Sequence, residues 1–591
     1  MSKGRSKWKK TVNVICVFLI ALVLITGYYT VTNSKNSAPN FNPNNMEKPD
    51  DNQNNMNDST KDENTNSNVN EDTNANDSTK KDMNANDNSN FNPNNMEKPP
   101  TSNGLSTNNL IILGICTFVL ITSLSIIVIN LKNKKLNKEQ KMILVLSLII
   151  ISLTLTFCLK LLLNKYYYTD QKQDNMIENQ NQQIATSGVV EISEEKEESN
   201  KNYTSDTSDK STIVVSKGGN YFLTNSTISK EGDTTNTENS EFYGLNAAVL
   251  VKNSGILSLS NSKITTKAKG ANAIFTTNSN SKITVSDTTI ETYKDSSRGL
   301  DATYGGEITA SNMKIHTRGN SSATLATDRG EGTVTVSDSN LKTEVKGSPI
   351  IYSTGKITLK DSEGLSTNSQ AVVIEGKNSA SLTNTKITTS AIGNRNSVDN
   401  AGVMIYQSMS GDASVGKGEF TSKNSSIIVD SSSSVYKTAP MFFITNTKAT
   451  INLENTTLTY GSNILLSIKG TNEWGNSGSN GGNLELNATN QKLSGDIILD
   501  SLSSVDINLK SSTLTSTINN NKKAKEVNIS IDKNSKWNVE GNSYINTLKL
   551  TNNDLNLIKD NGHNVYYDKE ANEWLDGKTY TLQDGGKLIP R

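Results

Sequence analysis

The stretch Ile256-Leu-Ser-Leu-Ser-Asn-Ser-Lys-Ile264 contains an alternating strand, a Ser/Asn/Asp turn and one closing aliphatic residue. The same phrase returns as Ile283-Thr-Val-Ser-Asp-Thr-Thr-Ile290, Val334-Thr-Val-Ser-Asp-Ser-Asn-Leu341 and Ile357-Thr-Leu-Lys-Asp-Ser-Glu-Gly-Leu365. The closing aliphatic residues are Ile264, Ile290, Ile315, Leu341, Leu365 and Ile387, at spacings of 26, 25, 26, 24 and 22 residues. A repeat of this length that contains period-2 strands predicts a solenoid.

Each repeat carries a second, short apolar run, such as Ala371-Val-Val-Ile374 or Gly402-Val-Met-Ile-Tyr406. Gly or Asn follows most of these runs, and both residues suit left-handed bends at the corner of a coil. Short strands joined by tight turns predict an all-β ectodomain, a right-handed parallel β-helix of ten to twelve coils over 211–562. We expect Ser and Asn side chains at the turns to form hydrogen-bonded ladders between coils.

The later repeats are longer than the earlier ones. The steps to Ile427, Leu458, Leu493 and Leu514 are 40, 31, 35 and 21 residues. Extra residues leave a solenoid as loops on one face, often the binding face. The sequence therefore predicts surface loops at 392–400, 407–418 and 470–482. Residues 563–591 are rich in aromatics and are predicted to be a C-terminal cap, or alternatively a separate aromatic binding site.

Three apolar segments, at about 11–30, 110–131 and 142–163, each have the length of a transmembrane helix. The N-terminal leader is basic, and Lys132, Lys134, Lys135, Lys138 and Lys141 lie between the second and third segments. The positive-inside rule then places the N-terminus in the cytoplasm and the C-terminal domain outside the plasma membrane. The first segment fits an uncleaved anchor better than a cleaved signal peptide, because no small-x-small site follows it.

These segments divide the N-terminal part of the chain. We predict a cytoplasmic leader and first span at 1–31, spans two and three with a short cytoplasmic loop at 108–165, and a stalk at 166–210. Residues 32–107 are Asn-rich with few aliphatics, which predicts a disordered extracellular segment. A phrase within it, Phe41-Asn-Pro-Asn-Asn-Met-Glu-Lys-Pro49, recurs at 91–99 and is either duplicated spacer or a short binding motif.

Composition excludes several kinds of function. The formal net charge of zero gives no general attraction to nucleic acid, so no nucleic-acid partner is expected. The cysteines, Cys16, Cys116 and Cys158, all lie in predicted spans, so the ectodomain is expected to have no disulfide. The only histidines are His316 and His563. We therefore expect no metal centre and no cofactor.

Most of the charged and aromatic side chains of types that can bind a ligand or react lie in the middle coils. The candidate ligand-binding residues are Arg298, Asp301, Tyr304, Asp328, Arg329, Tyr352, Glu375, Lys377, Tyr406, Gln407 and Trp474. The spacings of Thr327, Tyr352 and Glu375 follow the coil length and predict one column. Tyrosine rings pack on sugar faces, while carboxylates and Arg bond hydroxyl or acidic groups. Two alternatives stay open: ion pairs that fix coil register, and glycosidase catalysis by Asp301 and Asp328.

Four longer phrases carry a family resemblance. They are Ser297-Arg-Gly-Leu-Asp-Ala-Thr-Tyr-Gly-Gly306, Ala323-Thr-Leu-Ala-Thr-Asp-Arg-Gly-Glu-Gly332, Gly402-Val-Met-Ile-Tyr-Gln-Ser-Met-Ser-Gly-Asp412 and Trp474-Gly-Asn-Ser-Gly-Ser-Asn-Gly-Gly482. With them, 246–520 resembles the right-handed parallel β-helix surface proteins of Gram-positive bacteria, adhesin-like or carbohydrate-binding proteins of pectate-lyase-type architecture. The resemblance implies the fold. It implies no catalytic residue, because no pectinase motif matches residue by residue.

The leading functional hypothesis is a non-catalytic, membrane-anchored surface protein that binds a polysaccharide or a surface glycan. The first alternative is a cell-tethered polysaccharide lyase or hydrolase. The second is a structural surface stalk.

Overall fold

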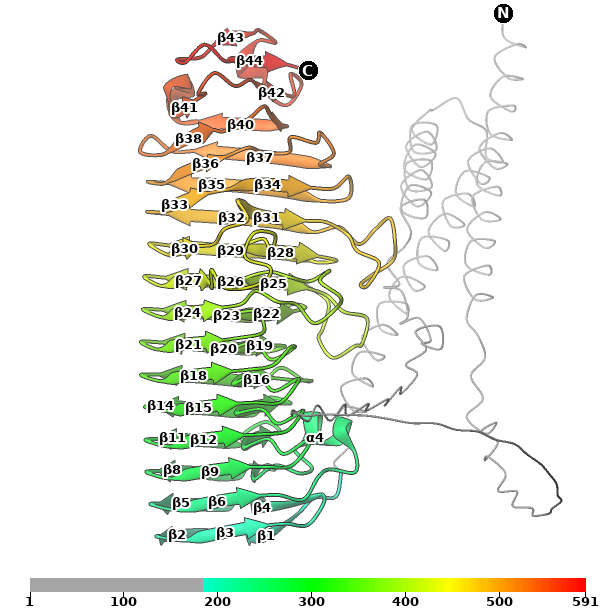
Figure 1. Ribbon diagram of the computed structural model, residues 1–591, viewed down its shortest axis with the longest axis vertical. Coiled ribbons are helices and arrows are strands. Elements are labelled where there is room, and N and C mark those ends of the chain that lie inside the picture. The colour runs from blue at the N-terminus through cyan, green and yellow to red at the C-terminus, as the bar shows by residue number, and fades with distance from the viewer. Residues whose placement is uncertain (1–183) are drawn as a thin grey trace, which may run out of the picture. The chain divides into compact units, whose positions relative to one another are not determined.

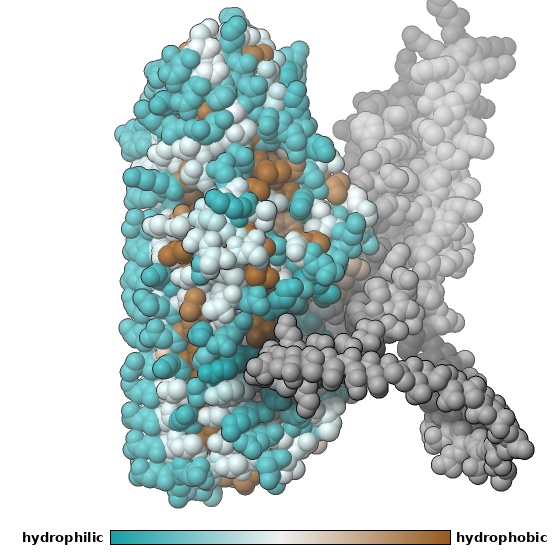
Figure 2. Space-filling view, viewed as in Figure 1, coloured by the Kyte–Doolittle hydropathy of each residue, from teal (hydrophilic) through white to brown (hydrophobic). Residues whose placement is uncertain are grey.

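The computed structural model describes residues 184–591, which form a stack of parallel strands (Figure 1). Successive rungs add one strand to each of three sheets, and strands of neighbouring rungs pair in register. The predicted solenoid of the parallel β-helix type is therefore confirmed for the described residues. Aliphatic side chains fill the interior, and the face seen in Figure 2 is mostly hydrophilic with scattered hydrophobic patches.

Three sheets run along the rod. Sheet A contains β1 (Ser187–Ile192), β4 (Lys210–Val215), β7 (Val249–Val251), β10 (Ile274–Thr277), β13 (Leu300–Thr303), β16 (Leu325–Thr327), β19 (Ile351–Ser353), β22 (Val372–Glu375), β25 (Val403–Tyr406), β28 (Phe442–Thr445), β31 (Ile464–Ile468) and β34 (Asp496–Leu499). Sheet B contains β2 (Glu195–Ser199), β5 (Asn220–Thr224), β8 (Ile256–Ser260), β11 (Lys282–Ser286), β14 (Glu307–Ser311), β17 (Thr333–Ser337), β20 (Lys356–Lys360), β23 (Ser379–Thr383), β26 (Lys417–Lys423), β29 (Lys448–Glu454), β32 (Asn483–Thr489), β35 (Ser504–Lys510), β37 (Glu526–Ile531) and β40 (Thr547–Leu550). Sheet C contains β3 (Asn202–Ser205), β6 (Thr227–Lys230), β9 (Lys263–Thr266), β12 (Thr289–Thr292), β15 (Lys314–Thr317), β18 (Asn340–Thr343), β21 (Glu363–Ser366), β24 (Lys386–Thr389), β27 (Ser426–Val429) and β30 (Thr457–Thr459).

Smaller elements complete the C-terminal end and one side of the rod. Two four-stranded sheets hold β33 (Lys492–Ser494), β36 (Thr513–Ser516), β38 (Lys536–Val539) and β41 (Ile558–Lys559), and β39 (Ser543–Ile545), β42 (Val565–Tyr567), β44 (Lys587–Pro590) and β43 (Tyr580–Thr581). The helices are α4 (Thr237–Tyr243) and the 3-10 turns η2 (Thr551–Asn553), η3 (Leu555–Leu557) and η4 (Glu573–Leu575). β43 pairs antiparallel with β44 at the C-terminal end of the stack.

The β-helix begins earlier than the sequence predicted. β1, β2 and β3 form a rung from Ser187 to Ser205, inside the segment 166–210 that was predicted to be a stalk. The acidic run looked like a solvated linker. However, main-chain pairing with β4, β5 and β6 does not require apolar side chains. In this rung Glu198 accepts hydrogen bonds from the hydroxyls of Tyr203 (2.8 Å) and Tyr221 (2.9 Å).

The stack is also longer than the predicted ten to twelve coils, because sheet B alone has 14 strands. The predicted boundary between β-helix and cap, at 562/563, falls between β41 and β42. No helix within 184–591 is long and apolar enough to cross a membrane. The three predicted spans and the segment 32–107 lie outside the described residues.

A buried aliphatic column in sheet C holds the rungs in register. Ile264, Ile290, Ile315 and Leu341 pair one above another, and all four are buried. The prediction for Leu365 is wrong: Gly364 occupies the next position of the column, and Leu365 points outward with 38% of its surface exposed. A Cβ on Gly364 would lie 3.3 Å from both Ile350 and Ile387, so these side chains already fill the space that Leu365 was predicted to occupy.

The turns between sheets B and C repeat one backbone conformation. Asn261, Asp287, Asn312, Asp338, Asp361 and Asn384 all have φ near +50°, the left-handed region that Asn and Asp tolerate best among non-glycine residues. Serines beside them form the predicted ladder: the Ser339 hydroxyl accepts from the Met313 amide, and the Ser362 hydroxyl from the Ser339 amide, each at 3.0 Å. The prediction of hydrogen-bonded ladders between coils is confirmed.

Ile315→Ala and Leu365→Ala are expected to differ in their effect on stability, although both residues belong to the same sequence pattern. Removing the buried Ile315 side chain should lower the free energy of unfolding by about 2–5 kcal/mol. Removing the exposed Leu365 side chain should change it by less than about 0.5 kcal/mol. Urea unfolding of the full-length variants, followed by circular dichroism, measures both values. Equal losses would contradict the pairing of Gly364, rather than Leu365, with the buried column of sheet C.

Candidate functional site

The outer face of sheet A carries a column of buried side chains. Phe275, Asp301, Ala326, Tyr352, Val373, Met404 and Phe443 pair in register across successive rungs. Their neighbours Ile274, Leu300 and Leu325 belong to the central core, so this column points away from it. Six of the seven are buried because α4 and long loops cover this face. Figure 1 shows α4 and these loops projecting from the same side of the rod.

A groove of about 370 Å³ lies on this face, and we call it the sheet A groove. Its floor includes Arg298, Asp328, Tyr352, Val373, Glu375, Met404 and Tyr406. Glu241 and Phe242 line it from α4, Asn394, Arg395 and Asp399 from the 390–402 loop, Ser408, Ser410 and Asp412 from the 407–416 loop, and Trp474 from the 469–482 loop. Since parallel strands lie about 4.8 Å apart, floor residues from the rungs of β13 to β25 extend over roughly 20 Å.

The helix α4 was not predicted, although the sequence held a signal for it. Ile228 and Ile264 pair directly on neighbouring rungs, yet they are 36 positions apart in the sequence. The residues in excess of an ordinary coil of 22–26 form α4 and its flanks. Asn236 caps the helix by accepting a hydrogen bond from the Asn239 amide (2.9 Å). Asn272 and Thr303 donate to the carbonyls of Ser240 (3.0 Å) and Phe242 (2.9 Å) and fasten α4 to sheet A. This attachment brings Glu241 and Phe242 to the groove.

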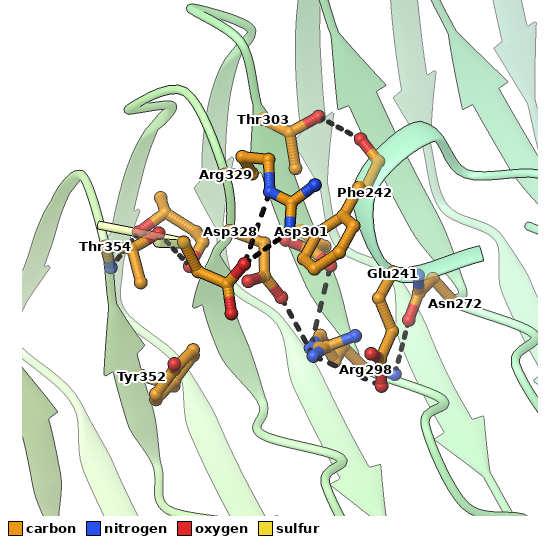
Figure 3. Close-up of polar contacts among 12 residues, drawn as sticks. Glu241, Phe242, Asn272, Arg298, Asp301, Thr303, Asp328, Arg329, Tyr352 and Thr354 are labelled. Atoms are coloured by element: carbon orange, nitrogen blue, oxygen red, sulfur yellow. Dashed lines mark hydrogen bonds and ion pairs between the residues drawn. The ribbon is translucent and has the colours of Figure 1, made fainter. Parts of the chain in front are cut away.

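At the end of the groove next to α4, the guanidinium of Arg298 lies close to three carboxyl groups (Figure 3). Arg298 Nη2 lies 2.8 Å from Asp328 Oδ2 and 3.6 Å from Glu241 Oε1, and Arg298 Nε lies 3.7 Å from Asp301 Oδ2. Asp301 is fully buried. Neither of its carboxyl oxygens accepts a hydrogen bond, and Arg298 Nη1 donates none, within the described residues.

Burial and crowding of like charges affect how this cluster ionises. Burial raises the pKa of Asp301 to about 7; Arg298 lowers that pKa and Glu241 raises it further. Burial also raises the pKa of Asp328 well above its ordinary value, again opposed by Arg298. Because Asp328 lies closer to the guanidinium than Asp301 does, Asp328 is the carboxyl that ionises first and Asp301 the one that keeps a proton.

A second carboxylate, Glu375, is surrounded by donors. Its Oε2 accepts from the hydroxyls of Tyr352 (2.9 Å) and Tyr406 (2.8 Å). Its Oε1 accepts from the amide (3.3 Å) and the hydroxyl of Ser408. Burial raises the pKa of Glu375, and these hydrogen bonds oppose the rise. Glu375 thereby fixes both tyrosine rings and the start of the 407–416 loop.

Two contacts close the groove on its sides. Arg329 Nη2 and Nε donate to Asp412 Oδ1 at 2.6 and 3.2 Å, and the guanidinium lies 3.8 Å from the centre of the Phe242 ring. Arg329 thus joins the 407–416 loop to α4. At the far end, Trp474 meets the Tyr406 ring edge-on at 5.2 Å between centroids.

Most, but not all, of the predicted site residues gather at the groove. Arg298, Asp328, Tyr352, Glu375, Tyr406 and Trp474 line it, Asp301 lies behind Arg298, and Arg329 bonds to a lining residue. Tyr304 stacks on Tyr243 instead, with the ring centroids 5.5 Å apart. Lys377 pairs with Glu331 at 2.8 Å, and both are about half exposed. Gln407 is buried, and its amide nitrogen donates to the carbonyls of Ser408 and Ala413 inside the loop.

The predicted column of Thr327, Tyr352 and Glu375 is wrong. Tyr352 pairs with Ala326 and Val373, while Glu375 pairs with Tyr406. Coil lengths of 22–26 residues leave an uncertainty of one or two positions, and one position reverses the side chain. Besides Glu241 and Phe242, the prediction missed Asn394, Arg395, Asp399, Ser408 and Ser410 as lining residues. Loop length marked two of these loops in the sequence but could not show which residues turn inward.

The arrangement can bind a ligand that offers both hydrogen-bonding groups and flat apolar faces. No group of three or more His, Cys, Asp or Glu in residues 184–591 has the geometry to hold a metal ion. The chain matches no protein-family model, and no curated protein is significantly similar to it.

The pH dependence of stability tests the ionisation of Asp301. Its folded-state pKa lies above the value of about 3.9 for an unfolded chain, so its contribution to stability is complete below pH 4 and is lost as pH rises through about 7. For one proton the loss is at most about 1.4 kcal/mol per pH unit. Asp301→Asn should therefore unfold at a higher urea concentration than the wild type at pH 7.5. The difference should shrink towards pH 4, and a pH-independent difference would contradict the assignment.

Proposed function

We propose that this protein is a non-catalytic surface protein that binds a glycan in the sheet A groove. The observation that carries the proposal is the combination, along roughly 20 Å of one face, of aromatic rings with charged and amide side chains. Sugars have flat faces of C–H groups edged by hydroxyls. Aromatic rings pack on the former, while carboxylates, arginines and amides bond the latter.

The aromatic groups are held in place before any ligand arrives. Glu375 fixes the rings of Tyr352 and Tyr406 through their hydroxyls. Trp474 is fixed by packing on Tyr406 and by Asn480, whose amide donates to the Trp474 carbonyl at 2.7 Å. Rings that are already fixed lose little conformational entropy when a ligand binds, and this raises the affinity for glycans, which proteins usually bind weakly.

The state of the carboxyl groups favours binding over hydrolysis. Glycosidases use two available carboxyl groups on either side of the scissile bond. In the sheet A groove, Glu375 accepts four hydrogen bonds, Asp412 is paired with Arg329, and Asp301 lies fully buried behind Arg298. Asp399 accepts two backbone amides, so Asp328 and Glu241, which share Arg298, remain as the partly engaged acids. A polysaccharide hydrolase or lyase stays the second candidate, because burial raises the pKa of Asp328 and suits it to donate a proton.

The proposal also includes the cellular location of the protein. We propose that the three N-terminal apolar segments anchor the chain in the plasma membrane, and that the rod projects outside the cell as a right-handed β-helix of pectate-lyase-type architecture. This is the arrangement of adhesin-like surface proteins of Gram-positive bacteria. The basic residues of the leader and of 131–141 support the orientation.

Tyr406→Ala should weaken glycan binding by the full-length protein about tenfold or more, because the ring contacts the ligand and supports Trp474. Tyr406→Phe keeps the ring and should retain most of the affinity. Phe222→Ala is the matched control, since Phe222 is 37% exposed on sheet B, away from the groove. A glycan array identifies the ligand, and titration calorimetry gives the affinities. Absence of binding to any glycan, or equal losses for Tyr406→Ala and Phe222→Ala, would exclude the proposal.

Long incubation with the glycans that bind tests the second candidate. We expect the chain-length distribution to stay unchanged for the wild type and for Asp328→Asn. Chromatography of the products would reveal new reducing ends from hydrolysis or unsaturated ends from elimination. Shortened chains that disappear with Asp328→Asn would establish an enzyme in place of a binding protein.

A further inference from the structure

The sheet A groove is lined by more acidic than basic side chains. Its lining includes five carboxyl groups and two guanidinium groups. Not all of the five are equally available. Asp399 accepts hydrogen bonds from the backbone amides of Asn394 and Arg395, each at 2.9 Å, and Asp412 is paired with Arg329. The excess is therefore concentrated around Arg298.

Arg298 cannot balance its surroundings alone. Glu241, Asp301 and Asp328 lie 3.6, 3.7 and 2.8 Å from its nitrogens, so three carboxyl groups share one positive charge. Two further arginines lie at the groove: Arg329 is committed to Asp412 and to the Phe242 ring, and Arg395 lines the groove from the 390–402 loop. Buried charges are stable when each has a partner of opposite sign. The cluster thus lacks the positive charge needed for all three carboxyl groups to ionise, and Asp301 keeps a proton.

The cluster also lacks hydrogen-bond donors, and it has one spare donor of its own. Both carboxyl oxygens of Asp301 are buried and accept no hydrogen bond of good geometry from any described residue, although the adjacent Ala302 amide opposes the rise that burial causes in the Asp301 pKa. Arg298 is 94% buried and lines the groove, and its Nη1 has no acceptor within residues 184–591. Unmatched buried polar groups are rare and call for an explanation. Glu241, Arg298 and Asp328 line the groove while Asp301 lies behind them, so a ligand with several donors beside a neutral acceptor can reach this cluster only through those three side chains.

We propose that the sheet A groove selects amino-sugar glycans with free ammonium groups. This inference rests on the proposed glycan binding and adds the class of sugar. An ammonium group supplies positive charge to the cluster and up to three donors to Glu241 and Asp328, the two of its carboxyl groups that line the groove. A neighbouring sugar hydroxyl oxygen can accept from the Arg298 guanidinium where it lines the groove. Polymers of uronic acids are disfavoured, since their carboxylates would meet five carboxyl groups and only two guanidinium groups.

A metal ion is a poorer occupant than an ammonium group. The guanidinium of Arg298 already lies among the three carboxyl groups, where it would repel a divalent ion (Figure 3). An ammonium group can approach from the groove side, which Asp328 and Glu241 line.

Three hexamers test the inference on the full-length protein by titration calorimetry. They are β-1,4-linked glucosamine, the same hexamer fully N-acetylated, and a hexamer of galacturonic acid. The glucosamine hexamer should bind at least about tenfold more tightly than its acetylated form, because its ammonium groups form charge-assisted hydrogen bonds that the acetylated amides cannot. The acidic hexamer should bind least. Asp328→Asn and Glu241→Gln should each reduce this preference, and Glu307→Gln on sheet B should leave it unchanged, because Glu307 pairs with Lys282 there.

Proton release gives a readout independent of affinity. The charged groups around the cluster are Glu241 from α4, Arg298 and Asp301 at β13, Asp328 after β16, Tyr352 in β19 and Asp412 from the 407–416 loop. An ammonium group entering this cluster displaces the proton held by Asp301 and Asp328. The binding enthalpy near pH 6 should therefore depend on the ionisation enthalpy of the buffer, and Asp301→Asn should remove most of that dependence.

The possible outcomes separate the two proposals. Stronger binding of the acetylated or the acidic hexamer overturns the amino-sugar inference and leaves glycan binding in place. A requirement for added Ca²⁺ also overturns it, since a metal ion would then supply the missing charge. Failure of all three hexamers overturns the inference, and only failure of the wider glycan array overturns the proposed function. Circular dichroism of Asp328→Asn and Glu241→Gln confirms that a lost preference does not come from unfolding.

Discussion

Main-chain hydrogen bonding between successive rungs is the constraint on which this structure depends. Each strand must pair with the strands above and below it, so every rung must return the chain to the same place in three sheets. The left-handed turn residues, such as Asp287 and Asn384, turn the chain from sheet B into sheet C at the same point of each rung. Buried residues such as Ile290 and Ile315 then meet one above another and exclude water from the interior.

This constraint leaves the protein free to vary between strands. A rung may hold many extra residues if its strands still reach their pairing positions. The insertions before β7, β25, β26 and β32 use this freedom, and all four contribute residues to the sheet A groove. The repetitive part of the chain thus provides a rigid floor, while the irregular part provides α4, the loops and the ends of the groove. Aromatic and charged side chains on sheet A are buried only because those insertions cover them.

The Arg298 cluster is hard to explain by stability alone. Ion pairs such as Lys282–Glu307 on sheet B match one positive charge to one negative charge and lie in water. The cluster instead buries Asp301 and Asp328 against a single guanidinium and leaves polar atoms of Asp301 and Arg298 without partners among the described residues. Such an arrangement costs free energy in the unliganded state. A ligand that supplies positive charge and hydrogen-bond partners would offset this free-energy cost. The cost of the unliganded site is thereby linked to selective binding.

The amino-acid sequence by itself determined the class of fold, because a repeat of 22–26 residues with alternating aliphatics can bury its apolar side chains only by stacking. It also identified six of the residues that line the groove, since charged and aromatic side chains stand out in otherwise Ser/Thr/Asn-rich coils. It could not decide register: Leu365 and Gly364 differ by one position, and a shift of one position exchanges the inside of a strand for the outside. Only the tertiary structure decided that α4 folds over sheet A, that Glu241 joins Asp328 on one arginine, and that Lys377 and Tyr304 turn away, because these contacts join residues whose separation follows no repeat.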